Sequence, residues 1–261
     1  MALRSIYVAV FIIFGINNQL YASHDWYGKV FVDYQSTSND INGNKTDVNN
    51  NASRFGIKGS FLLSDNSKLK LVYQAEYQFD PVDGKARGDD GTLKQRNTFI
   101  GIQTDLGMLF AGTHDSAFRK SQLKIDLFND LAADIKTILR GENRMNNLLG
   151  FTTRTSKKGI SVTFNAIKGS TESVNNSARD STSVSLNYKT KSFYAAISID
   201  SKLEGYDSTR LTLQLPWDKT QLGIIYQDTE KLSTGIKEDG YVVSLSYKVR
   251  KKGLIKVQQV E

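Results

Sequence analysis

The feature that most constrains the fold of this chain is a repeated alternation of apolar and polar residues with a period of two. In one segment, Leu211, Leu213 and Leu215 alternate with Thr212 and Gln214. Such a period puts apolar side chains on one face of a β-strand and polar ones on the other. The expected strands approach the ~9–11 residues that a tilted strand needs to cross a bilayer. We predict thirteen strands, at roughly 25–36, 52–63, 67–80, 93–104, 107–112, 147–156, 159–168, 179–190, 192–200, 207–216, 219–228, 239–249 and 253–260.

The connections between these strands alternate in length along the chain. Tight turns such as 157–158 and 217–218 alternate with long polar loops, of which 37–51 looks the most disordered. A membrane barrel that runs up and down has short turns at one end and long loops at the other. A soluble sandwich, with Greek-key connections, has no reason to sort its loops by length. The pattern therefore predicts an all-β fold, a transmembrane antiparallel up-and-down β-barrel, with a soluble all-β protein as the alternative.

The first residues have the character of a secretory signal peptide. Arg4 supplies a positive charge, an apolar run extends from Ile6 to Ile16, and Ala22 is a small residue at the expected cleavage site. The run is too short to cross a membrane comfortably as a helix. We therefore assign residues 1–22 to a signal peptide and residues 23–261 to one barrel domain in the cell envelope.

Composition removes several classes of function. The chain has no cysteine, so disulfides, thiolate metal sites and cysteine nucleophiles are excluded. The net charge is +7, but the lysines and arginines are scattered and accompany no nucleic-acid-binding motif. We expect no nucleic-acid partner and no cofactor. The surplus charge then indicates either a solvated surface or a lumen that favours anions.

The residues that could carry catalysis do not form a convincing site. His114 is followed directly by Asp115 and Ser116, but adjacent loop residues rarely point at one reaction centre, and no nucleophile elbow surrounds the serine. His24 lies at the expected mature N-terminus, and the two histidines lack the spacing of metal ligands. We therefore predict no catalytic residues, no metal site and no enzyme activity.

The longest loop, about 113–146, is the most informative connection. Its apolar residues recur at helical spacing from Leu127 to Ile138, which predicts a short amphipathic helix. A loop of this length in a compact fold is usually functional, and in a barrel it can fold inward and narrow the lumen. The alternative is a solvated helix face on an external loop. Four acidic residues lie in this loop: Asp126, Asp130, Asp134 and Glu142.

Basic residues on the strands are expected to complement this acidic loop. Arg54 and Lys58 alternate with the apolar Phe55 and Ile57, so the two sets point to opposite faces. A lipid-facing Arg or Lys near the bilayer midplane costs about 2–4 kcal/mol, which favours the lumen. A basic wall facing an acidic loop produces a transverse field that filters solutes by charge and size. The expected wall consists of Arg54, Lys58, Lys70, Arg96 and Arg154.

Several short segments resemble the Gram-negative general porins. They are WYGK at 26–29, SRFGIKG at 53–59, FIGI at 99–102, DLFND at 126–130 and RMNN at 144–147. The resemblance implies a sixteen-stranded barrel, usually a homotrimer, in the lipid and lipopolysaccharide of the outer membrane, with the third external loop folded into the lumen. It also implies that Arg54 and Arg96 belong to the basic wall, and that Asp126, Asp130 and Asp134 belong to the acidic side of the constriction.

The end of the chain departs from that family. The family closes on a strand with a terminal aromatic residue, whereas this chain ends at Val257–Glu261, within the thirteenth expected strand. We therefore expect about thirteen of sixteen strands and a barrel domain that is incomplete at its C-terminus. The sequence predicts a passive diffusion channel for small hydrophilic solutes and ions. The alternatives are a structural or adhesin-like outer-membrane barrel without conductance and a non-functional truncated porin.

Overall fold

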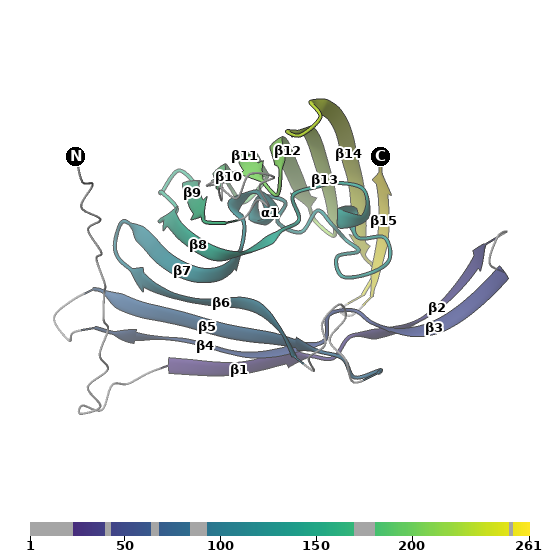
Figure 1. Cartoon of the computed structure of the whole chain (residues 1–261), viewed down its shortest axis with the longest axis horizontal. Helices are drawn as coiled ribbons and strands as arrows, with labels where there is room; N and C mark the ends of the chain where they lie inside the picture. Colours follow the sequence, from purple (N-terminus) through teal and green to yellow (C-terminus); the bar gives the residue numbers. More distant parts are fainter. Residues whose placement is uncertain (1–22, 40–42, 64–67, 84–92, 170–180, 251–252) are drawn as a thin grey trace, which may run out of the picture.

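The computed structural model describes residues 23–39, 43–63, 68–83, 93–169, 181–250 and 253–261. They form one antiparallel sheet of thirteen strands, each paired with its neighbours along the chain, and a separate two-stranded hairpin (Figure 1). The strands of the large sheet are β1 (Ser23–Lys29), β4 (Arg54–Leu62), β5 (Lys70–Phe79), β6 (Leu93–Gln103), β7 (Gly107–Asp115), β8 (Arg144–Thr153), β9 (Ile160–Ile167), β10 (Ser181–Lys189), β11 (Tyr194–Leu203), β12 (Tyr206–Trp217), β13 (Thr220–Lys231), β14 (Ile236–Lys248) and β15 (Leu254–Val260). The predicted up-and-down order is confirmed, and so is the number of thirteen strands in the large sheet.

The prediction of one continuous first strand at 25–36 is wrong, because two strands cover this stretch. The first of them, β1, ends at Lys29. The chain continues as β2 (Val32–Asn39), which pairs with β3 (Gly43–Asn50) in a hairpin that extends away from the large sheet (Figure 1). The loop expected at 37–51 is therefore largely strand. The Ser53 hydroxyl bonds both the N–H and the carbonyl of Phe31, which fixes the point where the chain leaves the sheet.

The two faces of the sheet differ as the period of two predicts. Ile197 and Leu211 are cross-strand partners and remain 42% and 50% exposed on the outer face. The next pair in the register, Ser198 and Arg210, points inward and is 1% and 0% exposed. An apolar outer surface around a polar interior is the arrangement that a barrel needs in lipid. Among the described residues, no helix is both long and apolar enough to cross a membrane.

The long connection between β7 and β8 lies on the concave side of the sheet. It begins with α1 (Ala117–Ser121), which packs against β9, β10 and β11 (Figure 1). Further along, Ile125, Ile135 and Leu139 form a buried apolar cluster with Ile225 and Val242 of the sheet. The inward folding of this segment follows from these apolar contacts, because they remove its hydrophobic side chains from the lumen.

The amphipathic helix expected between Leu127 and Ile138 is wrong. Only a short 3₁₀ turn, η1 (Ile135–Thr137), forms in this stretch. Asp134 accepts hydrogen bonds from the N–H groups of Asp130 and Lys136, and Asp130 itself has a φ of 69°. Aspartates that bond to nearby backbone N–H groups in this way favour turns over continuous helix.

The sheet is open in this structure. β1 and β15 form its two edges, and they do not pair with each other. An unpaired strand edge leaves N–H and C=O groups without partners, each at a cost of several kcal/mol in lipid. The strands of the sheet curve strongly around the inward loop (Figure 1), so the interior is defined by the sheet and this loop together.

Candidate pore constriction

Arg54 brings the basic wall into contact with the inward loop. It is the first residue of β4, and its Nη1 lies 3.2 Å from Oδ2 of Asp130. Its Nε lies 3.7 Å from Oε2 of Glu76 on β5. The neighbouring Phe55 is 38% exposed on the outer face, so Arg54 points inward as its phase predicts. One expected basic residue and one expected acidic residue therefore meet in a direct ion pair.

Glu76 neutralises part of the wall from within the sheet. Its Oε1 accepts a 2.7 Å hydrogen bond from Nε of Arg96, and its Oε2 accepts one of 3.0 Å from the Tyr27 hydroxyl. Arg96 also donates to the amide oxygen of Gln78. Lys58 lies beside this group, with its Nζ 5.5 Å from the centre of the Tyr27 ring. The four strands β1, β4, β5 and β6 thus carry a compact network in which most of the basic charge is already compensated.

The remaining acidic residues of the loop hold its shape. Asp126 is 8% exposed, and its Oδ1 accepts hydrogen bonds from the Phe128 N–H and from Nε2 of Gln258 on β15. Burial raises the pKa of Asp126, and the nearby charge of Asp134 raises it further. Asp134 is 1% exposed and bonds within the loop. Neither carboxylate faces open lumen.

Glu142 joins the loop to the opposite part of the sheet. Its Oε1 lies 2.7 Å from Nη1 of Arg210, which is fully buried on β12. The Arg210 guanidinium also donates to Gln227 and to the carbonyl of Arg140, and it stacks over the Phe118 ring. Burial raises the pKa of Glu142, while the positive charge of Arg210 opposes that rise.

A third charged cluster stands at the start of the loop. Asp115 Oδ1 lies 3.2 Å from Nη1 of Arg119 and 3.1 Å from Nη2 of Arg144, and its Oδ2 accepts a hydrogen bond from Asn97. This cluster joins the end of β7 to the start of β8 across the base of the loop. Both ends of the loop are therefore fixed by buried or half-buried ion pairs.

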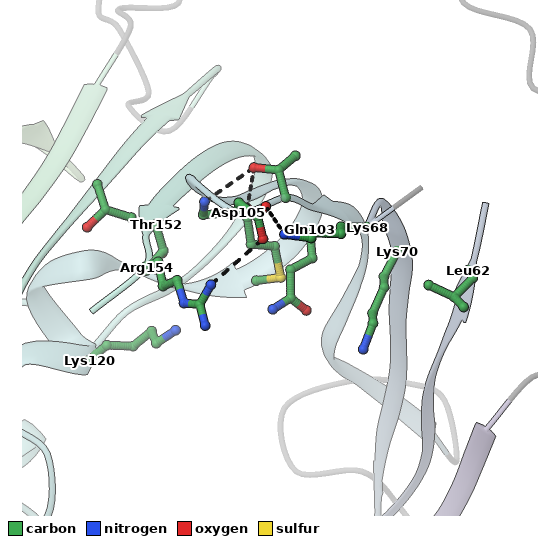
Figure 2. A pocket seen from close by; sticks show the side chains of 12 residues that line it. Leu62, Lys68, Lys70, Gln103, Asp105, Lys120, Thr152 and Arg154 are labelled. Carbon is green, nitrogen blue, oxygen red and sulfur yellow. Dashed lines mark hydrogen bonds and ion pairs between the residues drawn. The ribbon is translucent and has the colours of Figure 1, made fainter. Parts of the chain in front are cut away.

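Lys70 and Arg154 lie apart from these networks. Arg154 follows the end of β8, and its Nη1 lies 3.8 Å from Oδ1 of Asp105 in a tight turn. Both residues line a separate cavity at the tight-turn end of the inner wall (Figure 2). The structure thus divides the five predicted wall residues into two groups: Arg54, Lys58 and Arg96 near the loop, and Lys70 and Arg154 at the turns.

His114 has a packing role in this geometry. Its ring lies 4.9 Å from the Phe99 ring and 4.8 Å from the Phe110 ring, and its Nδ1 lies 2.8 Å from the Asp115 carbonyl oxygen. The Ser116 hydroxyl accepts a hydrogen bond from the Arg119 N–H and caps α1. Within the described ranges, no group of three or more His, Cys, Asp or Glu side chains could hold a metal ion.

A comparison with known protein families shows which family the chain belongs to. The family model described as Gram-negative porin matches residues 19–258. The chain belongs to the Gram-negative porin family. The porin is therefore an outer-membrane protein that forms a diffusion channel, and both family and fold are those of channels rather than enzymes.

Solved porin structures share its fold. An anion-selective porin from Comamonas acidovorans superposes with a TM-score of 0.72 at 16% identity, over 92% of this chain and 78% of that chain. OmpF of Salmonella typhi, solved in complex with daunomycin, gives a TM-score of 0.66 at 16% identity, over 91% and 78% of the two chains. A mutant porin of Rh. blastica gives 0.51 at 11% identity, over 92% and 94%. No match was found among curated protein sequences.

Sequence reasoning missed several charged residues of the porin interior. Arg210 is in phase with Ser208 and Thr212, opposite the outward Leu211, so the period of two could have placed it on the inner wall. Glu76 has the same kind of signal, because it alternates with the apolar residues of β5. Their partners could not have been found this way, since each pairing depends on how the loop or the neighbouring strand is placed.

Proposed function

We propose that small hydrophilic solutes and ions pass through the porin beside a loop, 113–146, that is fastened across its interior. The observation that carries this proposal is that the loop is tied to strands far apart in the sheet. Asp130 pairs with Arg54 on β4, and Glu142 pairs with Arg210 on β12. A segment held from both sides has to narrow the space between them, so it sets the size of solute that passes.

The charges at the constriction have a mechanical role in this proposal. Asp130 contacts Arg54 directly, so the two charges neutralise each other instead of facing each other across water. On the far side, the Asp126 carboxylate and the carbonyl of Ala133 accept hydrogen bonds from Gln258 of β15. These ties favour discrimination by size at the loop, with discrimination by charge left to the unpaired residues elsewhere on the inner wall.

Conductance in planar bilayers tests the channel. We expect the porin, purified from outer membranes, to give stable steps of current that scale with salt concentration. The Asp130→Asn variant should conduct more, because the loop loses its tie to β4. Steps of unchanged size would show that this tie does not limit the opening. A folded protein that never conducts would instead support the structural-barrel alternative.

Two further properties belong to the proposal. Residues 1–22 lie outside the described residues, and their sequence supports removal as a signal peptide on export. Mass spectrometry of the mature protein should place its first residue at Ser23. The apolar outer face supports contact with outer-membrane lipid, with lipopolysaccharide and with copies of itself in a homotrimer. Chemical cross-linking in intact membranes should yield a species of three chains.

A further inference from the structure

A basic cavity lies at the tight-turn end of the inner wall. Its volume is about 620 Å³, and Figure 2 shows the side chains around it. Four of its lining residues are cationic: Lys68 and Lys70 beside the turn between β4 and β5, Lys120 from α1, and Arg154 after β8. Asp105 is the one acidic residue among the twelve that line it, so the lining carries four positive charges and one negative, a net +3.

The strand register places this cavity on the lumen side. Lys70 pairs with Gln103, Gln103 with Met108, and Met108 with Thr152, so one row of residues crosses β5, β6, β7 and β8. All four line the cavity. Lys120 lines the side of the cavity away from Lys70 (Figure 2), and the inward loop that carries it lies on the concave face of the sheet. These side chains therefore face the same interior space as the inward loop.

The acidic residue of the cavity is already engaged. Asp105 lies 3.2 Å from Nζ of Lys68 through one carboxylate oxygen and 3.8 Å from Nη1 of Arg154 through the other. Within the part of the chain that the structure describes, the side-chain ammonium groups of Lys70 and Lys120 have no ion-pair or hydrogen-bond partner. The lining therefore holds two cations with no counter-charge of their own.

Lys120 is the more unusual of these two lysines. Its neighbourhood lowers its pKa through desolvation, against which the charge of Asp115 acts. Asp115, however, is shared by Arg119 and Arg144 at distances of 3.2 and 3.1 Å. The Lys120 side chain is nevertheless exposed, so its ammonium group can contact an anion that enters the cavity.

We propose that this cavity, the turn-side basic cavity, binds small oxyanions that carry two negative charges, of which inorganic phosphate is the simplest. The inference rests on the proposed channel function, because it places the site on the permeation path. Arg154 offers a planar donor fork suited to oxyanions, and the lysines act as point charges. The lining residues include no aromatic side chain, so the cavity lacks the flat apolar surface on which a sugar would stack.

The size of the cavity fits weak binding of a partly hydrated anion. A volume of about 620 Å³ is many times the roughly 30 Å³ that one water molecule takes up in the liquid. The anion therefore keeps much of its water shell and is not held in a tight cage. Binding that is strong enough to attract a solute and weak enough to release it is what conduction requires.

The test measures phosphate binding with and without current. Chloride current through the porin is recorded in planar bilayers while phosphate is added at constant ionic strength. We expect phosphate to reduce the chloride current, at lower concentration when it is added from the tight-turn side. The variants Lys70→Gln and Lys120→Gln should each weaken this effect about fivefold, since each removes one unit charge beside the anion.

The matched control is Lys219→Gln, which removes the same charge from another tight turn, between β12 and β13, outside the cavity lining. It should leave the phosphate effect unchanged. In parallel, the ³¹P line width of phosphate is measured with the folded protein in detergent, where no current is needed. If the Lys70→Gln/Lys120→Gln double variant broadens the line as much as the native protein does, the proposed site is wrong, whether or not the porin conducts. Absence of conductance alone contradicts the channel and leaves the ³¹P result to decide the site.

Discussion

The charged side chains on the inner wall of the porin are arranged differently in two regions. Beside the loop, the charges are paired: Arg210 with Glu142 at 2.7 Å and Arg54 with Asp130 at 3.2 Å. At the tight-turn end, Lys70 and Lys120 have no such partner within the described residues. The paired charges are mostly buried and hold a segment of the chain, while the unpaired ones face the lumen and remain available to solutes.

Solvent access explains why the two regions differ. Arg210 and Glu142 have side chains that are 0% and 4% exposed, so each would pay a large desolvation penalty without the other. Lys70 is exposed in a cavity of about 620 Å³ and can keep its hydration. A charge in the first region is therefore expected to affect stability, and a charge in the second to affect permeation. Four predictions test this division.

The largest effect is expected for Arg210→Met. The substitution leaves Glu142 buried without its closest ionic partner, and breaking a buried pair in this way costs about 3–5 kcal/mol. The heat-induced mobility shift of the folded protein on gels should occur at a clearly lower temperature. The Arg210→Met/Glu142→Gln double variant should recover part of the loss, because it no longer buries a carboxylate whose remaining ion pair is the longer one with Arg119 at 3.7 Å.

The control for this prediction is Arg154→Gln. Arg154 is also an arginine in an ion pair, but its side chain is 72% exposed. Exposed pairs contribute about 0–1 kcal/mol, so its transition temperature should stay close to that of the native protein. Equal losses in the two variants would show that burial does not separate the two regions.

A smaller effect is expected from the pair between Arg54 and Asp130. Its side chains are 24% and 9% exposed, which places it between a buried and a surface pair. A double-mutant cycle with Arg54→Gln and Asp130→Asn should give a coupling energy on the order of 1 kcal/mol in the heat-induced transition. A coupling energy of zero would mean that the contact does not fasten the loop.

Asp105→Asn tests the comparison at the tight-turn end, in the turn-side basic cavity. It removes the acidic residue from the turn-side basic cavity and frees Lys68 and Arg154 to face a solute. The reduction of chloride current by phosphate should then need about fivefold less phosphate, with little change in the heat-induced transition. Weaker inhibition by phosphate in this variant would indicate that Asp105 positions the cations and does not merely oppose them.

The sequence predicted the fold because the deciding signal is local. Alternation along a single strand, as at Leu211 and Thr212, tells which face each side chain takes without knowledge of its neighbours. The same alternation sends Arg54 inward. The helix expected around Asp130 failed because a spacing of four residues is also compatible with turns, and the Asp134 carboxylate bonds two backbone N–H groups there.

The ion pairs at the site could not be predicted from the sequence, for a different reason. Arg210 and Glu142 are separated by 68 positions, and their contact depends on where the inward loop settles against β12. The cavity at Lys70 likewise combines the turn ends of several strands with Lys120 of α1. Alternation along one strand carries no information about which residues of distant strands or loops meet inside the barrel.

The smallest effect is expected at Asp126, through pH. Burial, assisted by the charge of Asp134, raises the pKa of Asp126 in the docked loop. The docked loop therefore holds this proton more tightly than the undocked loop does. Docking gains stability as the pH falls through the raised pKa, and it loses that gain as the pH rises through it.

Asp126→Asn removes this titration and keeps a side-chain oxygen for the Phe128 N–H and Gln258. Between about pH 4 and about pH 8, the temperature of the heat-induced transition of the native protein should fall relative to that of the variant as the pH rises. The slope of this difference against pH should correspond to at most about one proton. Glu142 titrates in both proteins, so its effect cancels in the difference. If the two curves of transition temperature against pH are parallel, the Asp126 carboxylate is already ionised in the docked loop at the lowest pH. Its contact with β15 would then resemble the paired charges at Arg210 more closely than its burial suggests.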